Sequence, residues 1–130
     1  MRHDEFLAKV RERGEYHGQE EAEEITVSVL GVLASRITGS EAEDLAAQLP
    51  EPLDRPLIDG AGTRAGIFGV EEFLRRVGRL TGARPRTAEW DASAVLSTLA
   101  EAVSGGELNQ VLSQLPSGFA PLFGKPELSG

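Results

Sequence analysis

The amino-acid sequence predicts an all-α fold, a helical bundle of two tandem pseudo-symmetric repeats, each with three helices and a short C-terminal turn. Two observations predict this fold. Gln48-Leu49-Pro50 recurs 66 positions later as Gln114-Leu115-Pro116, and Val29-Leu30 recurs at the same separation as Val95-Leu96. Apolar residues also return every three or four positions through most of the chain, which is the spacing of one buried helix face.

The first repeat is expected over residues 4–57, with helices over 4–13, 19–37 and 40–49. Leu33 lies in the middle of the long helix and aligns with Leu99 in the second repeat, so we expect both residues in the core. The apolar stripe of the long helix comprises Ala22, Ile25, Val29, Leu33 and Ile37.

Glycine and proline predict where these helices begin and end. Gly39 is expected in the left-handed conformation that ends a helix, and Ser40 and Glu43 then form a capping box for the next one. Pro50 should end the third helix, and Pro56 should cut short the turn that follows it.

The second repeat is expected over residues 70–123, with Pro85 in the first turn of its long helix. A glycine-containing linker over 58–69 should join the repeats, and residues 125–130 should form a flexible tail. One repeat buries little apolar surface, so we expect both repeats to share the core of a single domain over 1–124.

The composition excludes several functional classes. The chain has no cysteine, which excludes disulfides and thiolate metal sites. Its net charge of −8 disfavours nucleic-acid binding. It has no apolar stretch suited to a signal peptide or a membrane span, so we expect a cytoplasmic protein without membrane contact.

Charge is segregated along the chain. Acidic residues crowd the first half, whereas arginines crowd the stretch from Arg64 to Arg86. One interpretation is two solvated helix faces, and the other is a contact between the acidic half of one molecule and the basic half of another. The second interpretation makes Arg75, Arg76 and Arg79 candidate interaction residues.

Trp90 is the only tryptophan, and it occupies a position expected to face solvent. It either packs against the first helix of its own repeat or the linker, or it serves as an exposed aromatic anchor for a partner. We therefore add Trp90 to the candidate interaction residues.

No set of residues indicates catalysis, a cofactor or a metal ion. His3 and His17 lack ligand partners at helical spacing. The carboxylates of Glu41 and Asp44 are interpreted as solvated residues at a helix start. Asp91 interrupts an apolar helix face and is the candidate buried polar residue, which would need a donor such as an arginine.

Three segments carry a resemblance to a known family. Residues 4–7, residues 40–50 and the ending Leu115-Pro116, Phe119, Leu122-Phe123 resemble the bacterial family called domain of unknown function 2267. The resemblance implies an all-helical bacterial protein. It implies no activity, because none is assigned to that family.

Together these features predict a non-enzymatic protein-interaction module whose partner is another protein or a second copy of the chain. The alternative is a small-ligand-binding protein that holds an apolar or amphipathic molecule between the repeats. An exposed apolar patch would favour the first function, and an interior cavity would favour the second.

Overall fold

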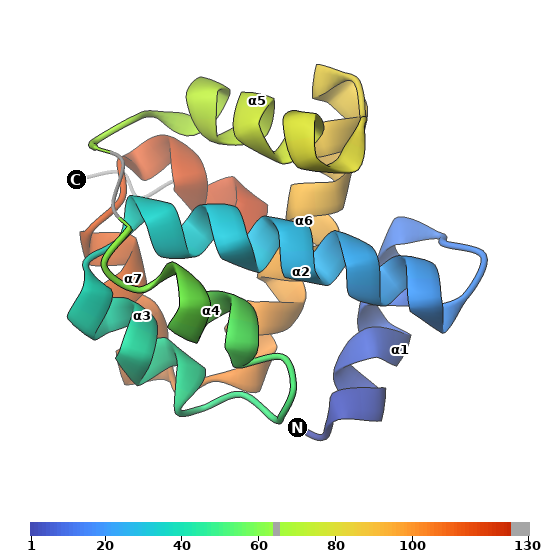
Figure 1. Cartoon of the computed structure of the whole chain (residues 1–130), viewed down its shortest axis with the longest axis horizontal. Coiled ribbons are helices and arrows are strands. Elements are labelled where there is room, and N and C mark those ends of the chain that lie inside the picture. The colour runs from blue at the N-terminus through green and yellow to red at the C-terminus, as the bar shows by residue number, and fades with distance from the viewer. Residues whose placement is uncertain (64–65, 126–130) are drawn as a thin grey trace.

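The computed structural model describes residues 1–63 and 66–125, and this part of the chain is all-α, with no strand (Figure 1). The all-α class is therefore confirmed. The elements are α1 (His3–Gly14), α2 (Gln19–Arg36), α3 (Gly39–Ala46), α4 (Arg55–Gly60), α5 (Val70–Thr81), α6 (Pro85–Ala102), α7 (Gly105–Ser113) and the 3-10 helix η1 (Ser117–Phe123).

The two long helices, α2 and α6, organise the bundle. Helix α2 crosses the middle of the molecule and packs against α1, α4, α5 and α6 (Figure 1). Helix α6 lies behind it and packs against α1, α5 and η1. The short helices α3 and α7 contact each other. Helix lengths recur along the chain, with 12 residues in α1 and α5 and 18 in α2 and α6.

The core is built around α2 and α6 and takes in residues from each of the other helices. Leu33 and Leu99 are buried, with 0% and 1% of their surface exposed, as the apolar stripes predict. Phe73 and Phe119 meet edge to face, with ring centroids 5.2 Å apart. Ile25 is the exception in the predicted stripe, because it is only partly buried. None of the described helices combines the length and apolar character that a membrane span requires.

The short turn predicted at the end of the first repeat is instead a helix that extends into the predicted linker. Helix α4 continues to Gly60, and Pro56 lies near its start instead of ending a turn. A proline fits there because the N–H groups in the first turn of a helix have no acceptor within the helix, so the N–H that proline lacks is not missed. Gly60 is required by close packing, since a Cβ there would lie 2.6 Å from Cβ of Ala34 on α2. Of the predicted tail, residues 126–130 lie outside the described residues.

The predicted cap of α3 is also wrong. Helix α2 ends with Ile37 in an extended conformation, so the turn needs no left-handed glycine, and Gly39 instead begins α3. Thr38 is the N-cap, and its hydroxyl accepts the N–H of Glu41 at 3.3 Å. Ser40 and Glu43 are exposed. The sequence contained this cap as Thr38-x-x-Glu41, two residues before the predicted one.

This correction can be tested by substitution. Thr38→Ala is expected to lower the free energy of unfolding by about 0.5–2 kcal/mol, because it removes the cap, whereas Ser40→Ala should change it by less than about 0.5 kcal/mol. Urea denaturation followed by circular dichroism measures both. Equal losses in the two variants would show that Thr38 is not the cap.

Candidate functional site

The three candidate arginines lie on α5 around one carboxylate. Glu72 accepts from Arg76 Nε at 2.8 Å, and it also pairs with Arg75 at 3.2 Å and Arg79 at 3.5 Å. The hydrogen bond from Arg76, with the charges of the other two arginines, lowers the pKa of the Glu72 carboxyl below its usual range. Glu71, exposed one turn before Arg75, adds a second negative charge, so three arginines against two glutamates leave this part of α5 with an excess of positive charge.

Arg76 has different surroundings from Arg75 and Arg79. The Arg76 guanidinium lies 3.9 Å from the ring centroid of Phe68, and only 28% of its side chain is exposed. Arg75 and Arg79 expose 58% and 65% of their side chains. Arg76 therefore has a packing role, and Arg75 and Arg79 are available for contact. Arg64, the first arginine of the basic stretch, lies outside the described residues.

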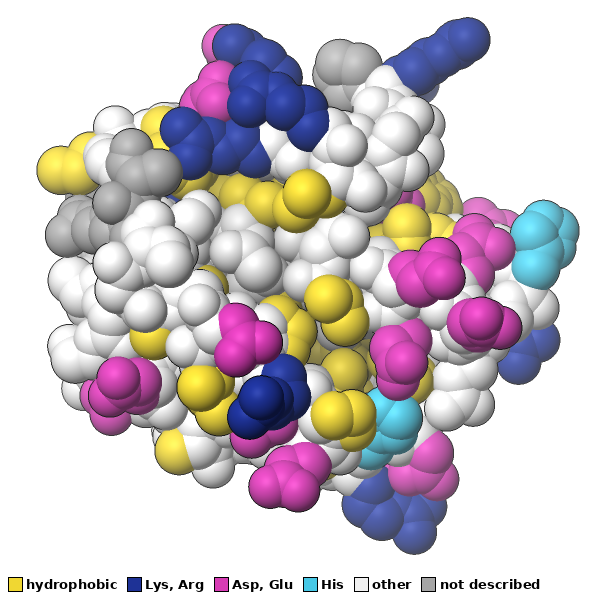
Figure 2. Space-filling model, viewed as in Figure 1, with side chains coloured by type: hydrophobic (Ala, Val, Ile, Leu, Met, Phe, Trp, Pro, Cys, Tyr) yellow, Lys and Arg dark blue, Asp and Glu magenta, His cyan; other side chains and the backbone are white. Residues whose placement is uncertain are grey.

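Apolar surface accompanies these two arginines. Leu80, in the last turn of α5, is 62% exposed. A hollow of about 360 Å³ along α5 is lined by Leu74, Arg75 and Arg79, among others. A second hollow of about 260 Å³ lies between α5 and α2, and its lining includes Leu80 and Val32. Figure 2 shows the dark blue group along the upper edge, over α5, with yellow side chains below it.

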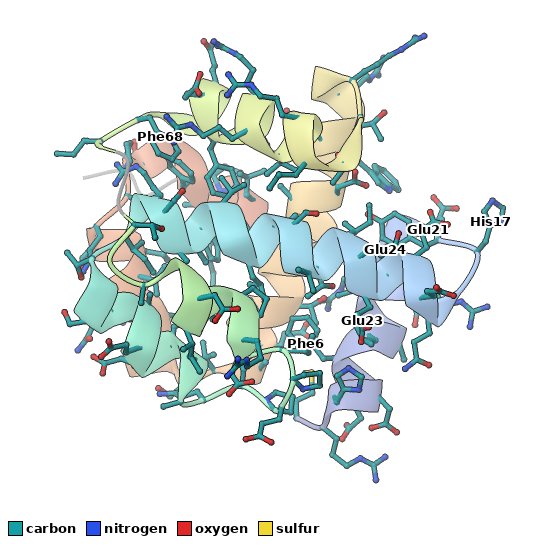
Figure 3. All side chains as sticks on the ribbon, viewed as in Figure 1. Phe6, His17, Glu21, Glu23, Glu24 and Phe68 are labelled. Atoms are coloured by element: carbon teal, nitrogen blue, oxygen red, sulfur yellow. The ribbon has the colours of Figure 1, made fainter. Side chains whose placement is uncertain are left out.

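The acidic residues lie elsewhere, at the start of α2. Glu20, Glu21 and Glu24 are exposed there. Figure 3 labels Glu21 and Glu24 at this end of α2. His17, in the preceding loop, is exposed and points away from the bundle. His3 belongs to α1, and its Nε2 lies 3.0 Å from Glu23 Oε2 on α2.

Trp90 is half exposed and joins the two halves of the chain. Its indole N–H donates to the backbone carbonyl of Gly14, at the end of α1, at 3.0 Å, and 49% of the residue is exposed. The expectation that it packs on its own repeat missed this partner, since α1 belongs to the other repeat. Part of the ring remains exposed, but its only polar group is already used within the chain.

Asp91 is buried next to Trp90, as expected if it interrupts an apolar face, but its donor is not an arginine. The hydroxyl of Tyr16 donates to Asp91 Oδ1 at 2.6 Å. Burial raises the pKa of the Asp91 carboxyl, and the bond from Tyr16 opposes that rise. Burial and the same bond raise the pKa of the Tyr16 phenol. This hydrogen bond links the loop that follows α1 to α6.

The starts of α3 and α7 are capped across the bundle. Thr38 and Ser104 are the N-caps, and each accepts the N–H of the residue three positions later. The backbone N–H of Thr38 donates to Oε1 of Gln114 at 2.9 Å, and the N–H of Ser104 donates to Oε1 of Gln48 at 2.8 Å. Each glutamine therefore completes the cap of a helix in the other half of the chain.

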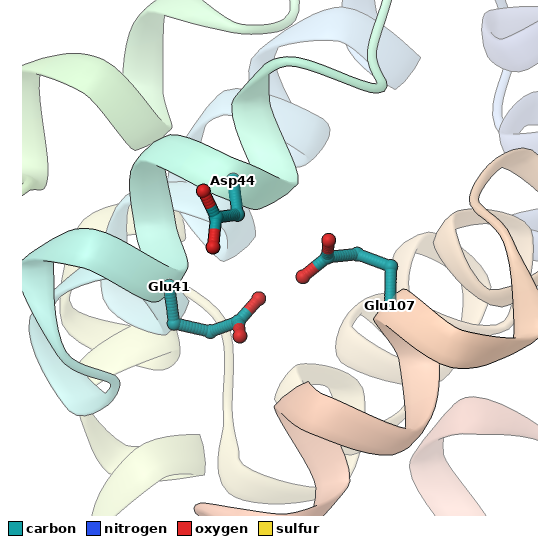
Figure 4. Close-up of side chains that lie close together, drawn as sticks. All are labelled: Glu41, Asp44 and Glu107. Carbon is teal, nitrogen blue, oxygen red and sulfur yellow. The ribbon is translucent and has the colours of Figure 1, made fainter.

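Three carboxylates converge between these two helix starts. One oxygen each of Glu41, Asp44 and Glu107 lies within 4.8 Å of the other two, and the side chains point toward one another (Figure 4). Within the described residues this is the only group of three acidic or histidine side chains spaced to hold a metal ion. Oxygen ligands of this kind suit Mg²⁺, Ca²⁺ or Mn²⁺.

The interpretation of Glu41 as a solvated residue is wrong, since only 4% of it is exposed. Burial, contact with Glu107 and the charges of Glu107 and Asp44 raise its pKa to about 8. A signal was present in the sequence, because Glu41 and Glu107 follow equivalent caps at the 66-residue separation. What the sequence could not supply was the contact between α3 and α7.

The raised pKa of Glu41 predicts a pH-dependent stability in the absence of metal. Unfolding returns the pKa from about 8 toward 4.5, so the folded state binds more protons between these values. Stability therefore falls as pH rises from about 4.5 to about 8, and it levels off above that. Glu41→Gln should remove this loss. At pH 8.5 with EDTA, the thermal midpoint of Glu41→Gln should exceed that of the wild type by at least about 5 °C. A gain of about 1–2 kcal/mol in the free energy of unfolding produces a shift of this size.

At pH 5 the two midpoints should nearly coincide. The exposed neighbour Glu43 supplies the matched control, and Glu43→Gln should follow the wild type at both pH values. Parallel pH curves for the wild type and Glu41→Gln would show that Glu41 keeps an ordinary pKa.

These features define the class of protein: an all-α bundle with a basic helix face, an acidic helix start and a carboxylate cluster at a capped junction. The chain belongs to the family of uncharacterized conserved proteins DUF2267, whose family model matches residues 3–122. No curated protein matches the chain. The suspected family is confirmed.

Proposed function

We propose that the protein is a non-enzymatic interaction module that associates with a second copy of itself through the basic face of α5. The observation that carries this proposal is the exposure of Arg75 and Arg79 next to the exposed Leu80. A basic rim around apolar surface is typical of a contact site for an acidic protein segment.

The proposed occupant of this face is the start of α2 in the second copy. Glu20, Glu21 and Glu24 are exposed there, on a helix start that lies apart from α5 of the same chain (Figures 2 and 3). The charges of the two surfaces are complementary. In a dimer with twofold symmetry, each α5 would meet the α2 start of its partner, and the contact would form twice. Trp90 is a secondary contributor in this proposal, because about half of the residue is exposed.

Charge reversal tests this proposal. The double variant Arg75→Glu, Arg79→Glu is expected to weaken self-association by about tenfold or more, because it places like charges opposite each other. Sedimentation velocity over a range of concentrations, at low and high salt, measures the change. The wild type should also dissociate at high salt, since exposed charges are screened.

Two further variants make the result specific. Arg11→Glu with Arg55→Glu changes the net charge equally at exposed positions on α1 and α4, and it should leave association unchanged. Adding Glu20→Arg and Glu24→Arg to the α5 double variant should restore association. A wild type that stays monomeric at every concentration, or a control that dissociates as much as the α5 variant, would refute the proposal.

The hollow between α2 and α5 supports a second candidate function, the binding of an amphipathic anion between the repeats. It is lined by Val32 and Leu80 on the apolar side and by Arg76 and Arg79 on the charged side. A medium-chain fatty acid such as decanoate is a suitable probe. Under this alternative, decanoate raises the thermal midpoint, and Leu80→Asp abolishes the rise.

We also infer that residues 4–57 and 70–123 are related by a pseudo-twofold axis. The inference is supported by contacts that occur in exchanged pairs, such as α1 with α6 and α5 with α2. The crossed caps at Thr38 and Ser104 are a second such pair. The inference implies that Ser104→Ala lowers stability to the same degree as Thr38→Ala.

A further inference from the structure

The crossed caps leave two glutamates without their usual partner. In a capping box, the glutamate three residues after the N-cap reaches back to the backbone N–H of the N-cap residue. Here Gln114 and Gln48 occupy those N–H groups at Thr38 and Ser104. Glu41 and Glu107 therefore do not accept these N-cap N–H groups.

These two glutamates turn toward each other, although their charges repel. Glu41 is 96% buried as a residue, and its Oε2 contacts no hydrogen-bond donor within the described residues. Oε2 of Glu107 is also buried and has no hydrogen-bond partner within the described residues. A buried carboxylate oxygen without a partner is strongly destabilising unless a positive charge or a proton compensates it.

We propose that Glu41, Asp44 and Glu107 form a binding site for a hard divalent cation, with Ca²⁺ preferred. Their ligand oxygens lie within 4.8 Å of one another, and all three side chains point into the space between α3 and α7 (Figure 4). Ca²⁺ binds oxygen at about 2.3–2.6 Å, so two of its ligands can lie up to roughly 5 Å apart. Mg²⁺, with bonds of about 2.0–2.1 Å, demands a near-ideal octahedron and gives up its water reluctantly, whereas Ca²⁺ accepts irregular sets of carboxylate and water oxygens.

The surroundings of the cluster suit such an ion. Asp44 is exposed, so water can fill the coordination positions that three carboxylates leave open. Gln48 Nε2 lies 3.4 Å from Oε1 of Glu107, the oxygen opposite the unpartnered Oε2. That contact orients Glu107 and leaves Oε2 for the ion. The bound ion would join the starts of α3 and α7 and so stabilise the junction between the two halves.

Thermal unfolding with and without metal tests the site. The wild type is treated with EDTA, dialysed, and melted at pH 7.5 in 10 mM CaCl₂, in 10 mM MgCl₂, and in NaCl of equal ionic strength. With a dissociation constant of about 10⁻⁴–10⁻³ M, the weak end of the range for calcium sites in proteins, Ca²⁺ is expected to raise the midpoint by roughly 5–10 °C. Mg²⁺ should raise it less. Isothermal titration calorimetry should give one Ca²⁺ per chain.

The variants Glu41→Gln and Glu107→Gln should lose most of the response to Ca²⁺. Both should remain folded, because each replacement removes repulsion from the cluster. Glu43→Gln, which changes an exposed glutamate on the same helix, should keep the full response.

Three results would overturn the proposal. One is an unchanged midpoint of the wild type in CaCl₂, in which case a shared proton compensates the carboxylates. Another is an equal rise in all variants, which would reflect general screening of the negative net charge. A response to Mg²⁺ that exceeds the response to Ca²⁺ would overturn the assignment of the ion.

Discussion

Leu33→Ala and Leu99→Ala are each expected to lower the free energy of unfolding by about 2–5 kcal/mol. Both leucines are buried in the last turn of the two long helices, not in the middle as expected, and both belong to the same core cluster. Truncation removes three carbon atoms from a packed interior that can collapse only in part, so lost transfer energy and a residual cavity add together. Differential scanning calorimetry should show midpoints lowered by roughly 10 °C or more in each variant.

Val27→Ala provides the control on the same helix as Leu33. Val27 is exposed, so its truncation should change stability by less than about 0.5 kcal/mol. If the midpoint were unchanged in Leu33→Ala and Leu99→Ala as well, the apolar stripes of α2 and α6 would not form the core.

Arg36→Ala is expected to destabilise the protein by about 3–5 kcal/mol. Arg36 is the largest fully buried side chain, with 1% of its surface exposed at the last turn of α2. Its Nε donates to the carbonyl of Phe68 at 2.6 Å, and a terminal nitrogen donates to the carbonyl of Gln114 at 3.3 Å. Truncation would leave a cavity and deprive both carbonyls of this donor.

The guanidinium of Arg36 also lies close to two aromatic rings. Its central carbon is 5.6 Å from the ring centroid of Phe68 and 5.9 Å from that of Phe119. Figure 3 shows Phe68 where the start of α5 approaches the end of α2. Arg36 therefore joins three segments that are far apart in the sequence, and a planar group with several donors is needed to reach all of them.

The variant Arg36→Lys distinguishes the contribution of the positive charge to stability from that of the planar guanidinium group. Lysine keeps the positive charge but has no planar fork, so we expect it to recover less than half of the lost stability. Arg11→Ala, at an exposed arginine on α1, is the control and should have little effect. Chemical denaturation measures all three variants. Full recovery with lysine would mean that the charge of Arg36 matters and its shape does not.

The carboxylate cluster and the α5 face make separable predictions. The cluster concerns stability and ion binding at the contact between α3 and α7, whereas the α5 face concerns association between molecules. Glu41→Gln should leave self-association intact, and the charge reversals at Arg75 and Arg79 should leave the Ca²⁺ response intact. Each proposal can therefore fail without the other.

The sequence by itself determined the helices, their core faces and the recurrence of the pattern. These features depend on local spacing, since three- and four-residue periods place apolar groups on one side of a helix wherever the helix lies. Leu33, Leu99 and the long helix beginning at Pro85 could be predicted for this reason. Short-range signals were less reliable, and they misplaced the cap at Ser40 and the role of Pro56.

Only the tertiary structure decided which polar groups meet. Asp91 accepts a hydrogen bond from Tyr16, and Trp90 donates one to Gly14. The N-cap residues of α3 and α7 donate to glutamines from the opposite half of the chain. Each of these partners lies between 56 and 76 residues away along the chain. No periodic pattern encodes such a distance, because the pairing is set by the positions in which whole helices pack. Glu41 and Glu107 became a candidate cation site for the same reason: burial and crossed capping, not spacing, bring them together.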